Sequence, residues 1–151
     1  MNYQIIDANR THMHQIANFQ VLMALETEQL ELNKETVLKG VESVFDKPEL
    51  GRYFVVIKDG KVVASLLITY EWSDWRNANV WWIQSVYVLP VFRRTGIFKL
   101  MYQHIQSIVE KDENVGGIRL YVDKTNKKAQ KTYENVGLNG NHYQLYEWMK
   151  S

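Results

Sequence analysis

Apolar and polar residues recur with two different periods along this chain, and each change of period predicts a new element. A short strand is expected over residues 3–7, and two stretches with helical spacing follow it. Thr11 is the candidate N-cap of the first helix and Asn33 that of the second, because both side chains can accept a hydrogen bond from a first helical turn. Pro48 marks the end of the second helix.

The clearest pair of elements is a hairpin. Strands over residues 52–57 and 61–70 are rich in β-branched and aromatic side chains, and Asp59-Gly60 between them is the preferred two-residue turn. A polar loop over 71–77 and a third strand over about 79–88 follow. In the second strand, alternation places one set of side chains on a common face, namely Ser65, Leu67, Thr69 and Glu71.

Helical spacing returns at Ile97, after a turn that contains Gly96. Beyond Gly116-Gly117, residues 118–122 read as a buried strand. Thr125 is then the candidate N-cap of a last helix.

Gly137 is expected to stop that helix, and residues 143–149 read as a final strand. The element order is therefore β-α-α-β-β-β-α-β-α-β. This order predicts a mixed α/β fold in which helices cover both faces of a central sheet, within a single domain over residues 1–151.

Composition narrows the function classes. The 151 residues are 46% hydrophobic and 23% charged, as in an ordinary globular domain. A net charge of +1 provides no broad footprint for nucleic acid. We expect neither a membrane span nor a signal peptide, and hence a cytoplasmic location. The absence of cysteine excludes disulfides, thiolate metal sites and a cysteine nucleophile, and the four histidines form no pair that suggests a metal.

The stretch from Gln84 to Met101 carries the strongest chemical signal. A strand leads to Pro90, then to Arg93-Arg94-Thr95-Gly96, and then into a helix. Backbone N–H groups at a helix start, together with the helix dipole and two arginines, favour an anion such as phosphate. The spacing fits neither a Walker-type loop nor a dinucleotide-binding fold.

This stretch resembles the acyl-CoA site of the GNAT superfamily of N-acetyltransferases. That family has a hydrophobic strand, often a proline, and then [RQ]-x-x-G-x-[GA] at the start of a helix. The matching residues are Val86-Tyr87-Val88-Leu89-Pro90 and Arg93-Arg94-Thr95-Gly96-Ile97-Phe98. Downstream, the family's Asn, Ala, Tyr and Gly correspond to Asn126, Ala129, Tyr133 and Gly137. The resemblance implies a mostly antiparallel, twisted sheet of about six to seven strands.

The same resemblance implies roles toward acetyl-CoA, the expected cosubstrate. Backbone groups of Val86, Tyr87 and Val88 would flank the pantetheine arm like an added strand. The pyrophosphate would lie on the amides from Arg93 to Phe98, which include those of Arg94, Thr95, Gly96 and Ile97. Asn126 and Ala129 would contact the CoA arm, and Tyr133 would give a proton to the leaving thiolate.

Phe98 departs from the family pattern, which prefers Gly or Ala at that position. Either the pyrophosphate contact is rearranged, or the ring packs under the helix. A second departure concerns the general base. The family often has a glutamate where this chain has Trp82, so no base is inherited by position.

The candidate bases are Glu71 first and Glu26 second, followed by Asp74 and His142. A base that acts through water, or an amine that arrives deprotonated, is equally admissible. Gln84, on the same strand face as Trp82, can order a water but cannot accept a proton at neutral pH.

The loop Trp72-Ser73-Asp74-Trp75 suggests an acceptor site. Together with Glu71, Trp81 and Trp82 it would form an aromatic, acidic pocket that suits a cationic amine; packing on the sheet or at a dimer contact is the alternative. We therefore expect Glu26, Trp72, Asp74, Trp75 and Gln84 to border the acceptor.

The resulting hypothesis is direct acetyl transfer, within a ternary complex, from acetyl-CoA to the primary amine of a small molecule, such as an amine, an amino acid or an amino-sugar-like compound. The alternatives are an acyl-CoA-binding sensor without turnover and acetylation of a protein or peptide amine. Dimers are common in the family, so a homodimer is a candidate assembly, although no residue of the sequence demonstrates one.

Overall fold

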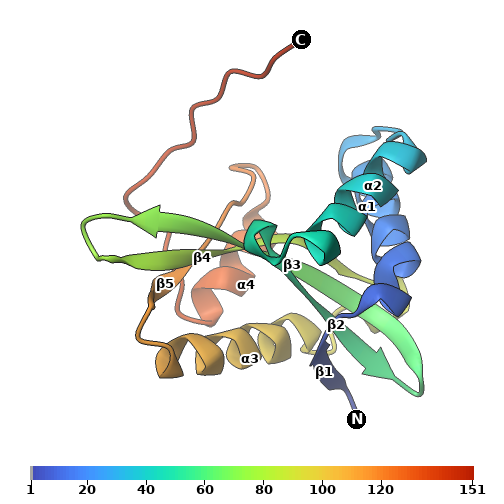
Figure 1. Cartoon of the computed structure of the whole chain (residues 1–151), viewed down its shortest axis with the longest axis horizontal. Helices are drawn as coiled ribbons and strands as arrows, with labels where there is room; N and C mark the ends of the chain where they lie inside the picture. The colour runs from blue at the N-terminus through green and yellow to red at the C-terminus, as the bar shows by residue number, and fades with distance from the viewer. Residues whose placement is uncertain (1) are drawn as a thin grey trace. The chain divides into compact units, whose positions relative to one another are not determined.

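The structure is a computed structural model that describes residues 2–151 (Figure 1). It divides into two compact units: the first ends at Tyr121, and the second comprises Val122–Ser151.

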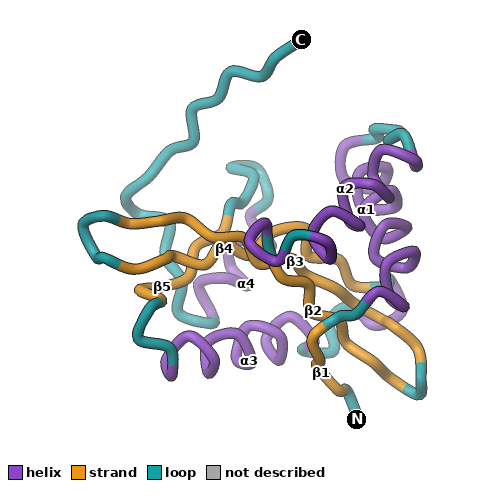
Figure 2. The backbone as a smooth tube through the Cα atoms, viewed as in Figure 1, coloured by secondary structure: helices purple, strands orange, loops and turns teal. Residues whose placement is uncertain are grey.

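The first unit is built on one sheet of five strands in the order β1-β2-β3-β4-β5. The strands are β1 Gln4–Asp7, β2 Arg52–Lys58, β3 Lys61–Ser73, β4 Ala78–Val88 and β5 Val115–Leu120. Neighbouring strands are antiparallel from β1 to β4, and β5 lies parallel to β4. Figure 2 shows these strands as the central orange layer between helices.

Helices cover both faces of this sheet. They are α1 Met13–Glu28, α2 Lys34–Asp46 and α3 Ile97–Lys111. Ile16 of α1 and Val41 of α2 share a buried cluster with Val55 of β2. The next side chain along β2, Phe54, faces the other way and meets His104 of α3 edge-on at 5.7 Å. Figure 1 accordingly shows α1 and α2 on one side of the sheet and α3 on the other.

Several boundaries agree with the sequence prediction. Asn33 caps α2 by accepting a hydrogen bond from Thr36 N at 2.9 Å. Asp59 and Gly60 both have positive φ, as the tight β2–β3 turn requires. Gln4–Asp7 and Arg52–Lys58 differ from the predicted strands by one residue each.

The predicted cap at Thr11 is wrong. A short 3-10 helix, Arg10–His12, precedes α1, and Asn9 caps it. Both the N–H and the hydroxyl of Thr11 donate to Asn9 Oδ1. An Asx side chain one turn earlier therefore takes the capping position.

The polar loop predicted over residues 71–77 is also shorter than expected. β3 continues to Ser73, because Glu71, Trp72 and Ser73 pair with Val80, Asn79 and Ala78. The strand predicted over 118–122 instead occupies Val115–Leu120. Its two glycines are compatible with a strand here because β4 provides the ladder.

The second unit contains one helix, α4 Lys127–Asn135. Asn126 caps it by accepting from Ala129 N at 3.0 Å, so the cap predicted at Thr125 is wrong. Thr125 instead binds Asp123 through its N–H and its hydroxyl. Gly137 has φ 98° just after the helix, which confirms the predicted stop.

The predicted final strand, residues 143–149, is not formed: these residues belong to no helix or strand. Residues 2–151 therefore contain five strands and not six to seven. A strand needs a neighbour for its backbone groups, and sequence periodicity does not supply one. No described helix combines the length and apolar character needed to cross a membrane. The cytoplasmic location stays a prediction.

Candidate functional site

The centre of the candidate site is a fork in the sheet. β5 pairs with β4 only as far as Leu120, which lies opposite Ile83. β3 accompanies β4 further, to the pair Ala64–Val88. Within the first unit, the last part of β4, residues 84–88, therefore has a strand on one edge only. Backbone groups on the other edge, which no described strand pairs, are available to an extended ligand.

A β-bulge shapes this part of β4. Ser65 pairs with Tyr87, but Leu67 pairs with Gln84, so β4 contains one extra residue opposite Leu66. Ser85 absorbs this insertion with φ 55°, a left-handed conformation that is uncommon for a residue with a side chain. The bulge therefore lies where β4 loses β5 as a neighbour.

The direction of the backbone groups follows from the ladder. Leu89 N donates to Val63 O at 2.9 Å, so Leu89 faces β3. Since backbone groups alternate along an antiparallel pair, Tyr87 also faces β3, whereas Val86 and Val88 direct their N–H and C=O groups to the open edge. Contact of Val86 and Val88 with a pantetheine arm stays a prediction, and Tyr87, which was expected with them, faces β3 instead.

The turn after β4 presents an open helix start. A 3-10 turn, Pro90–Phe92, leads to Arg94 with φ 63° and Gly96 with φ 84°. Gly96 is the N-cap residue of α3, and no side chain caps that terminus. A Cβ on Gly96 would have room, so backbone conformation and not crowding favours glycine here. The first N–H groups of α3 and its dipole can hold an anion.

Thr95 holds the turn from the inside. Its hydroxyl donates to Phe92 O at 2.6 Å and accepts from the Tyr3 hydroxyl at 3.1 Å. Tyr3 also meets the Phe92 ring edge-on at 6.5 Å. The side chain of Thr95 therefore fixes the turn, and its backbone remains the group that can face an anion. Tyr3 was not identified from the sequence, since it lies 92 residues away from Thr95.

Arg93 points toward the protein and not toward the open helix start. Its Nη2 lies 2.7 Å from Glu26 Oε1, and its Nε donates to Val88 O at 2.9 Å. The guanidinium also lies over the Tyr87 ring, 5.4 Å from the ring centroid. This side chain therefore organises the end of β4, which differs from the phosphate contact expected for it.

Glu26, at the end of α1, completes the same cluster. It accepts a hydrogen bond from the Tyr87 hydroxyl and is ion-paired with Arg93. These hydrogen bonds, from Tyr87 first and Arg93 second, hold the pKa of Glu26 below its ordinary value. Burial and the hydrogen bond to Glu26 raise the pKa of Tyr87 to about 12. A carboxylate stabilised in its charged form is a weak base, which argues against Glu26 as the general base.

A second cluster lies further along the sheet, across β3, β4 and β5. Glu71 Oε1 lies 2.6 Å from Arg119 Nη1 and accepts from Trp82 Nε1 at 3.3 Å. The Trp82 ring lies 4.4 Å from that of Tyr121. Thr69 pairs with Trp82, and Trp82 with Arg119, so these side chains share one face of the sheet. Glu71 is thus a member of an ion pair and not an isolated carboxylate.

Arg119 and Tyr121 were not identified from the sequence. The signal was present, because Arg119 is the one charged residue in the stretch 115–122, which otherwise reads as apolar. A charged residue in such a strand indicates a partner on a neighbouring strand.

The expected aromatic pocket is not assembled from the tryptophans. Trp72 pairs with Asn79 and Trp82 with Thr69, so Trp72 and Trp82 lie on opposite faces of the sheet. Trp75 is 94% exposed at the hairpin tip, next to the exposed Asp74. Trp81 packs edge-on against Tyr70 at 5.9 Å. Side chains alternate between the two faces of a strand, so neither Glu71 and Trp72 nor Trp81 and Trp82 can face the same side of the sheet. The expected pocket fails for this reason.

Gln84 lies on the face that carries Trp82 and Glu71. It pairs with Leu67 in the ladder, and its Nε2 donates to Thr69 Oγ1 at 2.5 Å. Gln84 stands one residue before the bulge at Ser85. This position suits a group that orders a water or an amine.

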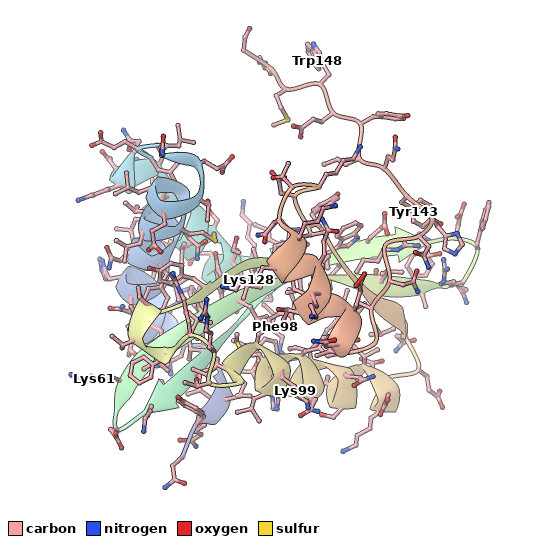
Figure 3. The ribbon with its side chains drawn as sticks, turned by 180° about the vertical axis from the view of Figure 1, so that it is seen from behind. Lys61, Phe98, Lys99, Lys128, Tyr143 and Trp148 are labelled. Atoms are coloured by element: carbon pink, nitrogen blue, oxygen red, sulfur yellow. The ribbon has the colours of Figure 1, made fainter. Side chains whose placement is uncertain are left out.

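Phe98 lies in the first turn of α3 and is labelled in Figure 3 beside Lys99. Its ring stacks on Tyr102, one turn further along the helix, at 6.3 Å. The ring therefore packs along its own helix, and the pyrophosphate contact at this position stays a prediction.

In the second unit, Asn126 uses its Oδ1 to cap α4, and Ala129 provides the N–H that it binds. Burial raises the pKa of Tyr133, so this phenol remains protonated at neutral pH. His142 is exposed and meets the Tyr143 ring at 6.4 Å. Residues 2–151 contain no group of three or more His, Asp or Glu that suits a metal ion.

Sequence comparison identifies a family. The model of the Acetyltransferase (GNAT) family matches residues 11–138 of this chain. No similar sequence was found among curated proteins. The match extends across both units, and a single domain over residues 1–151 stays a prediction.

Solved structures agree with this match. A possible acetyltransferase from Clostridium difficile 630 is 42% identical, with a TM-score of 0.92, over 100% of this chain and 99% of that chain. AAC(6')-Iy, solved with a bisubstrate analogue, CoA-S-monomethyl-acetylneamine, is 15% identical with a TM-score of 0.77, over 100% of both chains.

A predicted acetyltransferase from Clostridium acetobutylicum, solved with acetyl-CoA, is 14% identical with a TM-score of 0.75, over 97% of this chain and 96% of that chain. At such low identity, these last two structures support the fold alone.

Proposed function

We propose that this chain, which belongs to the Acetyltransferase (GNAT) family, transfers the acetyl group of acetyl-CoA to the primary amine of a small molecule. The observation that carries the proposal is the open edge of β4 beyond Ile83, next to the bulge at Ser85 and continuous with the uncapped start of α3. A strand edge followed by an anion site matches the two ends of an acyl-pantetheine chain with a pyrophosphate.

The pantetheine arm would pair with the open edge. Val86 and Val88 offer N–H and C=O groups there, and an amide-containing chain can satisfy them as an added strand would. Val88 O already accepts from Arg93 Nε, and a carbonyl oxygen has a second lone pair for the ligand. Arg93 thus orients the Val88 carbonyl, whose oxygen would also accept a hydrogen bond from the ligand.

The pyrophosphate would lie at the start of α3. The amides of Ile97, Phe98 and Lys99 point out of an uncapped terminus, and the dipole of a fifteen-residue helix favours negative charge there. Arg94 is exposed in the same turn and adds a cation, whereas Arg93 is held by Glu26. Asn126 retains its side-chain NH2 as a donor for the CoA arm, because capping uses only its oxygen.

The chemistry is a direct displacement. The amine nitrogen attacks the thioester carbon, the carbonyl oxygen becomes an oxyanion, and a backbone N–H at the β4 bulge would stabilise it. The C–S bond then breaks, and the CoA thiolate leaves. Tyr133 would donate the proton to that sulfur, since its raised pKa keeps the phenol protonated.

The proton of the attacking ammonium must also be removed. Glu26 and Glu71 each engage an arginine, so neither is an unpaired base. We therefore assign deprotonation to water ordered near Gln84, or to solvent before the amine binds. The acetylation rate should then rise with pH toward the pKa of the acceptor amine itself.

The acceptor would lie on the sheet face that carries Gln84, Trp82, Glu71 and Arg119. Trp82 and Tyr121 offer aromatic surface, and Glu71 offers a negative charge to an ammonium group before it loses its proton.

A thiol-release assay tests the proposal. CoA release from acetyl-CoA is measured with a thiol reagent across a panel of amines, amino acids, amino sugars and peptides; the protein itself has no cysteine and gives no background. We expect acceptor-dependent release with at least one small amine. Release with peptides alone would mean that the acceptor is a peptide amine and not a small molecule. Calorimetric binding of acetyl-CoA without release for any acceptor would contradict catalysis, and absence of binding would contradict the site.

A further inference from the structure

One face of the sheet stays accessible to solvent along β3 and β4 as far as the bulge at Ser85. The side chains on this face, none of them buried, are Leu67, Thr69, Glu71, Trp82 and Gln84. The side chains of Ile68, Trp81 and Ile83 point to the opposite face and are at most 5% exposed. The accessible face therefore forms a strip that a small molecule can reach, and the strip ends where β4 loses β5 as a neighbour.

Two opposite charges stand side by side on this strip. Glu71 Oε1 lies 2.6 Å from Arg119 Nη1, and 45% of the Glu71 side chain and 29% of the Arg119 side chain are exposed. An ion pair that solvent reaches contributes little net free energy, so its members can exchange partners at small cost. The pair is neutral as a whole and offers a ligand one negative and one positive group.

A neutral pair discriminates between ligands by their charges. An ammonium group that approaches Glu71 is repelled by the Arg119 guanidinium, which is hydrogen-bonded to the same carboxylate. A molecule with both an ammonium and a carboxylate group instead gains an attraction at each member of the pair. The guanidinium fork also matches a carboxylate in shape and can donate two parallel hydrogen bonds to it. The pair therefore favours a zwitterion over a simple amine.

The spacing along β4 fits a small zwitterion. Arg119 lies opposite Trp82 in the β4–β5 ladder, and Gln84 is the next residue of β4 on the same face. Two residues of a strand span about 7 Å, and the long arginine side chain can shorten that distance. A molecule held by its carboxylate at Arg119 can thus place its amine beside Gln84. The rings of Trp82 and Tyr121, 4.4 Å apart, border the same position.

We propose, building on the acetyl transfer proposed above, that the acceptor is an amino acid. Arg119 binds its carboxylate, and Glu71 attracts its ammonium group before deprotonation. The neutral amine then attacks the thioester beside Gln84, the C–S bond breaks, and the thiolate takes up one proton; the nitrogen loses one proton before the attack and a second after it. The N-acetyl product has no ammonium group for Glu71, so it keeps only one of the two attractions and is released more readily.

Matched pairs of acceptors test this proposal. CoA release is measured for the common α-amino acids and β-alanine, each beside its own amide, which keeps the amine and lacks the carboxylate. The amide loses its ammonium proton more readily than the amino acid, so a preference for the amino acid cannot come from the amine. We expect kcat/KM to favour the amino acid by roughly ten-fold or more in at least one pair.

Arg119→Gln should remove this preference. We expect kcat/KM for the amino acid to fall by roughly ten-fold or more, while kcat/KM for its amide and the KM for acetyl-CoA stay unchanged. Arg119→Lys keeps the charge without the fork and should restore part of the preference. Arg52→Gln is the matched control: Arg52 is also paired with an aspartate, Asp7, but it lies on the opposite face with Ile68. It should leave the preference intact.

Calorimetry adds a measurement without turnover. With CoA present, the amino acid should bind wild type roughly ten-fold or more tightly than it binds Arg119→Gln. Should Arg119→Gln fail to fold by circular dichroism, the comparison of amino acid and amide in wild type decides alone. Equal kcat/KM for the two acceptors, or an equal loss for both in Arg119→Gln, would overturn the amino acid as acceptor and leave acetyl transfer standing. Absence of CoA release with every acceptor, peptides included, would overturn both.

Discussion

Two glutamate–arginine pairs on this molecule are close chemical copies of each other. Glu26 lies 2.7 Å from Arg93, and Glu71 lies 2.6 Å from Arg119. Each glutamate also accepts a hydrogen bond from an aromatic side chain, the Tyr87 hydroxyl in the first pair and the Trp82 indole in the second. Tyr87 and Trp82 share one face of β4, since their partners Ser65 and Thr69 are four residues apart on β3.

The two pairs join different kinds of elements. Glu26 and Arg93 connect the end of α1 to β4 and to the turn before α3, and no backbone ladder links those elements. Tyr87 in this cluster is only 4% exposed and packs on Phe19 of α1 at 5.1 Å. Glu71 and Arg119 instead bridge strands that the ladder already aligns. We therefore expect the first ion pair to stabilise the junction between its elements and the second to be open to exchange with a charged ligand.

The strongest test of this comparison asks whether either paired glutamate is the base. We expect Tyr133→Phe to lower kcat about 100-fold, the size typical of a lost general acid. Glu26→Gln and Glu71→Gln should each keep kcat within about 3-fold, below the range for a lost base. Steady-state kinetics at fixed pH give these values. Tyr146→Phe, in the same unit as Tyr133, is the control and should not change kcat.

The second test removes the structural pair. Arg93→Ala leaves Glu26 and Val88 O without their shared donor and removes the cation over the Tyr87 ring, so we expect a loss of about 1–2 kcal/mol in the free energy of unfolding. The KM for acetyl-CoA should rise about 10-fold, because the end of β4 is no longer fixed. Urea unfolding and initial rates measure the two effects.

Arg94→Asn serves as the matched control, since asparagine tolerates the left-handed φ of 63° at that position. It should raise the KM for acetyl-CoA with little change in stability. Equal destabilisation by both substitutions would remove the distinction between the two arginines.

The third test addresses the exchangeable pair. Glu71→Gln should alter stability by no more than about 0.5 kcal/mol, as is usual for an exposed group. The KM for the amine should rise by roughly 3- to 10-fold, the effect of losing one charge near a surface, while the KM for acetyl-CoA stays constant. A stability loss as large as that of Arg93→Ala would mean that both ion pairs stabilise the fold to the same extent.

The smallest expected effect is a pH dependence of the first pair. The pKa of Glu26 is lowered in the folded state, so its stabilisation is complete above the unfolded value of about 4.3 and is lost as pH falls through the folded pKa. The stability difference between wild type and Glu26→Gln should thus be constant near neutral pH and shrink below about pH 4. Chemical denaturation at several pH values measures it; a difference that does not shrink as the pH falls into the acid range would contradict the ion pair as its source.

Local signals predicted much of the fold. Asp59-Gly60 and Asn33 were identified because turns and caps depend on a few neighbouring residues. Errors arose where two neighbouring residues compete for one role, as with Asn9 and Thr11, or Asn126 and Thr125. The final strand failed for a different reason, because no local rule names its partner.

The candidate site was likewise predicted where the signal is local and missed where a residue's partner is distant in the sequence. The turn around Gly96 and the orientation of Val86 and Val88 follow from a short stretch of sequence and its resemblance to a family. The partners of Arg93 and Glu71 lie 67 and 48 residues away, so only the folded chain reveals them. The direction of each side chain across the sheet, which separates Trp72 from Trp82, depends in the same way on the observed register.

Because β4 and β5 separate, hydrogen exchange at the end of β4 can report whether a ligand occupies the open edge. Amide hydrogens of Val86 and Val88 face the open edge, whereas that of Tyr87 faces β3. In solvent exchange with deuterium, the empty protein should therefore show a fast-slow-fast pattern over these consecutive residues. A bound pantetheine arm would slow the outer pair and leave the middle one as it was. Three adjacent amides thus distinguish an occupied edge from a general gain in rigidity, which would slow all of them together.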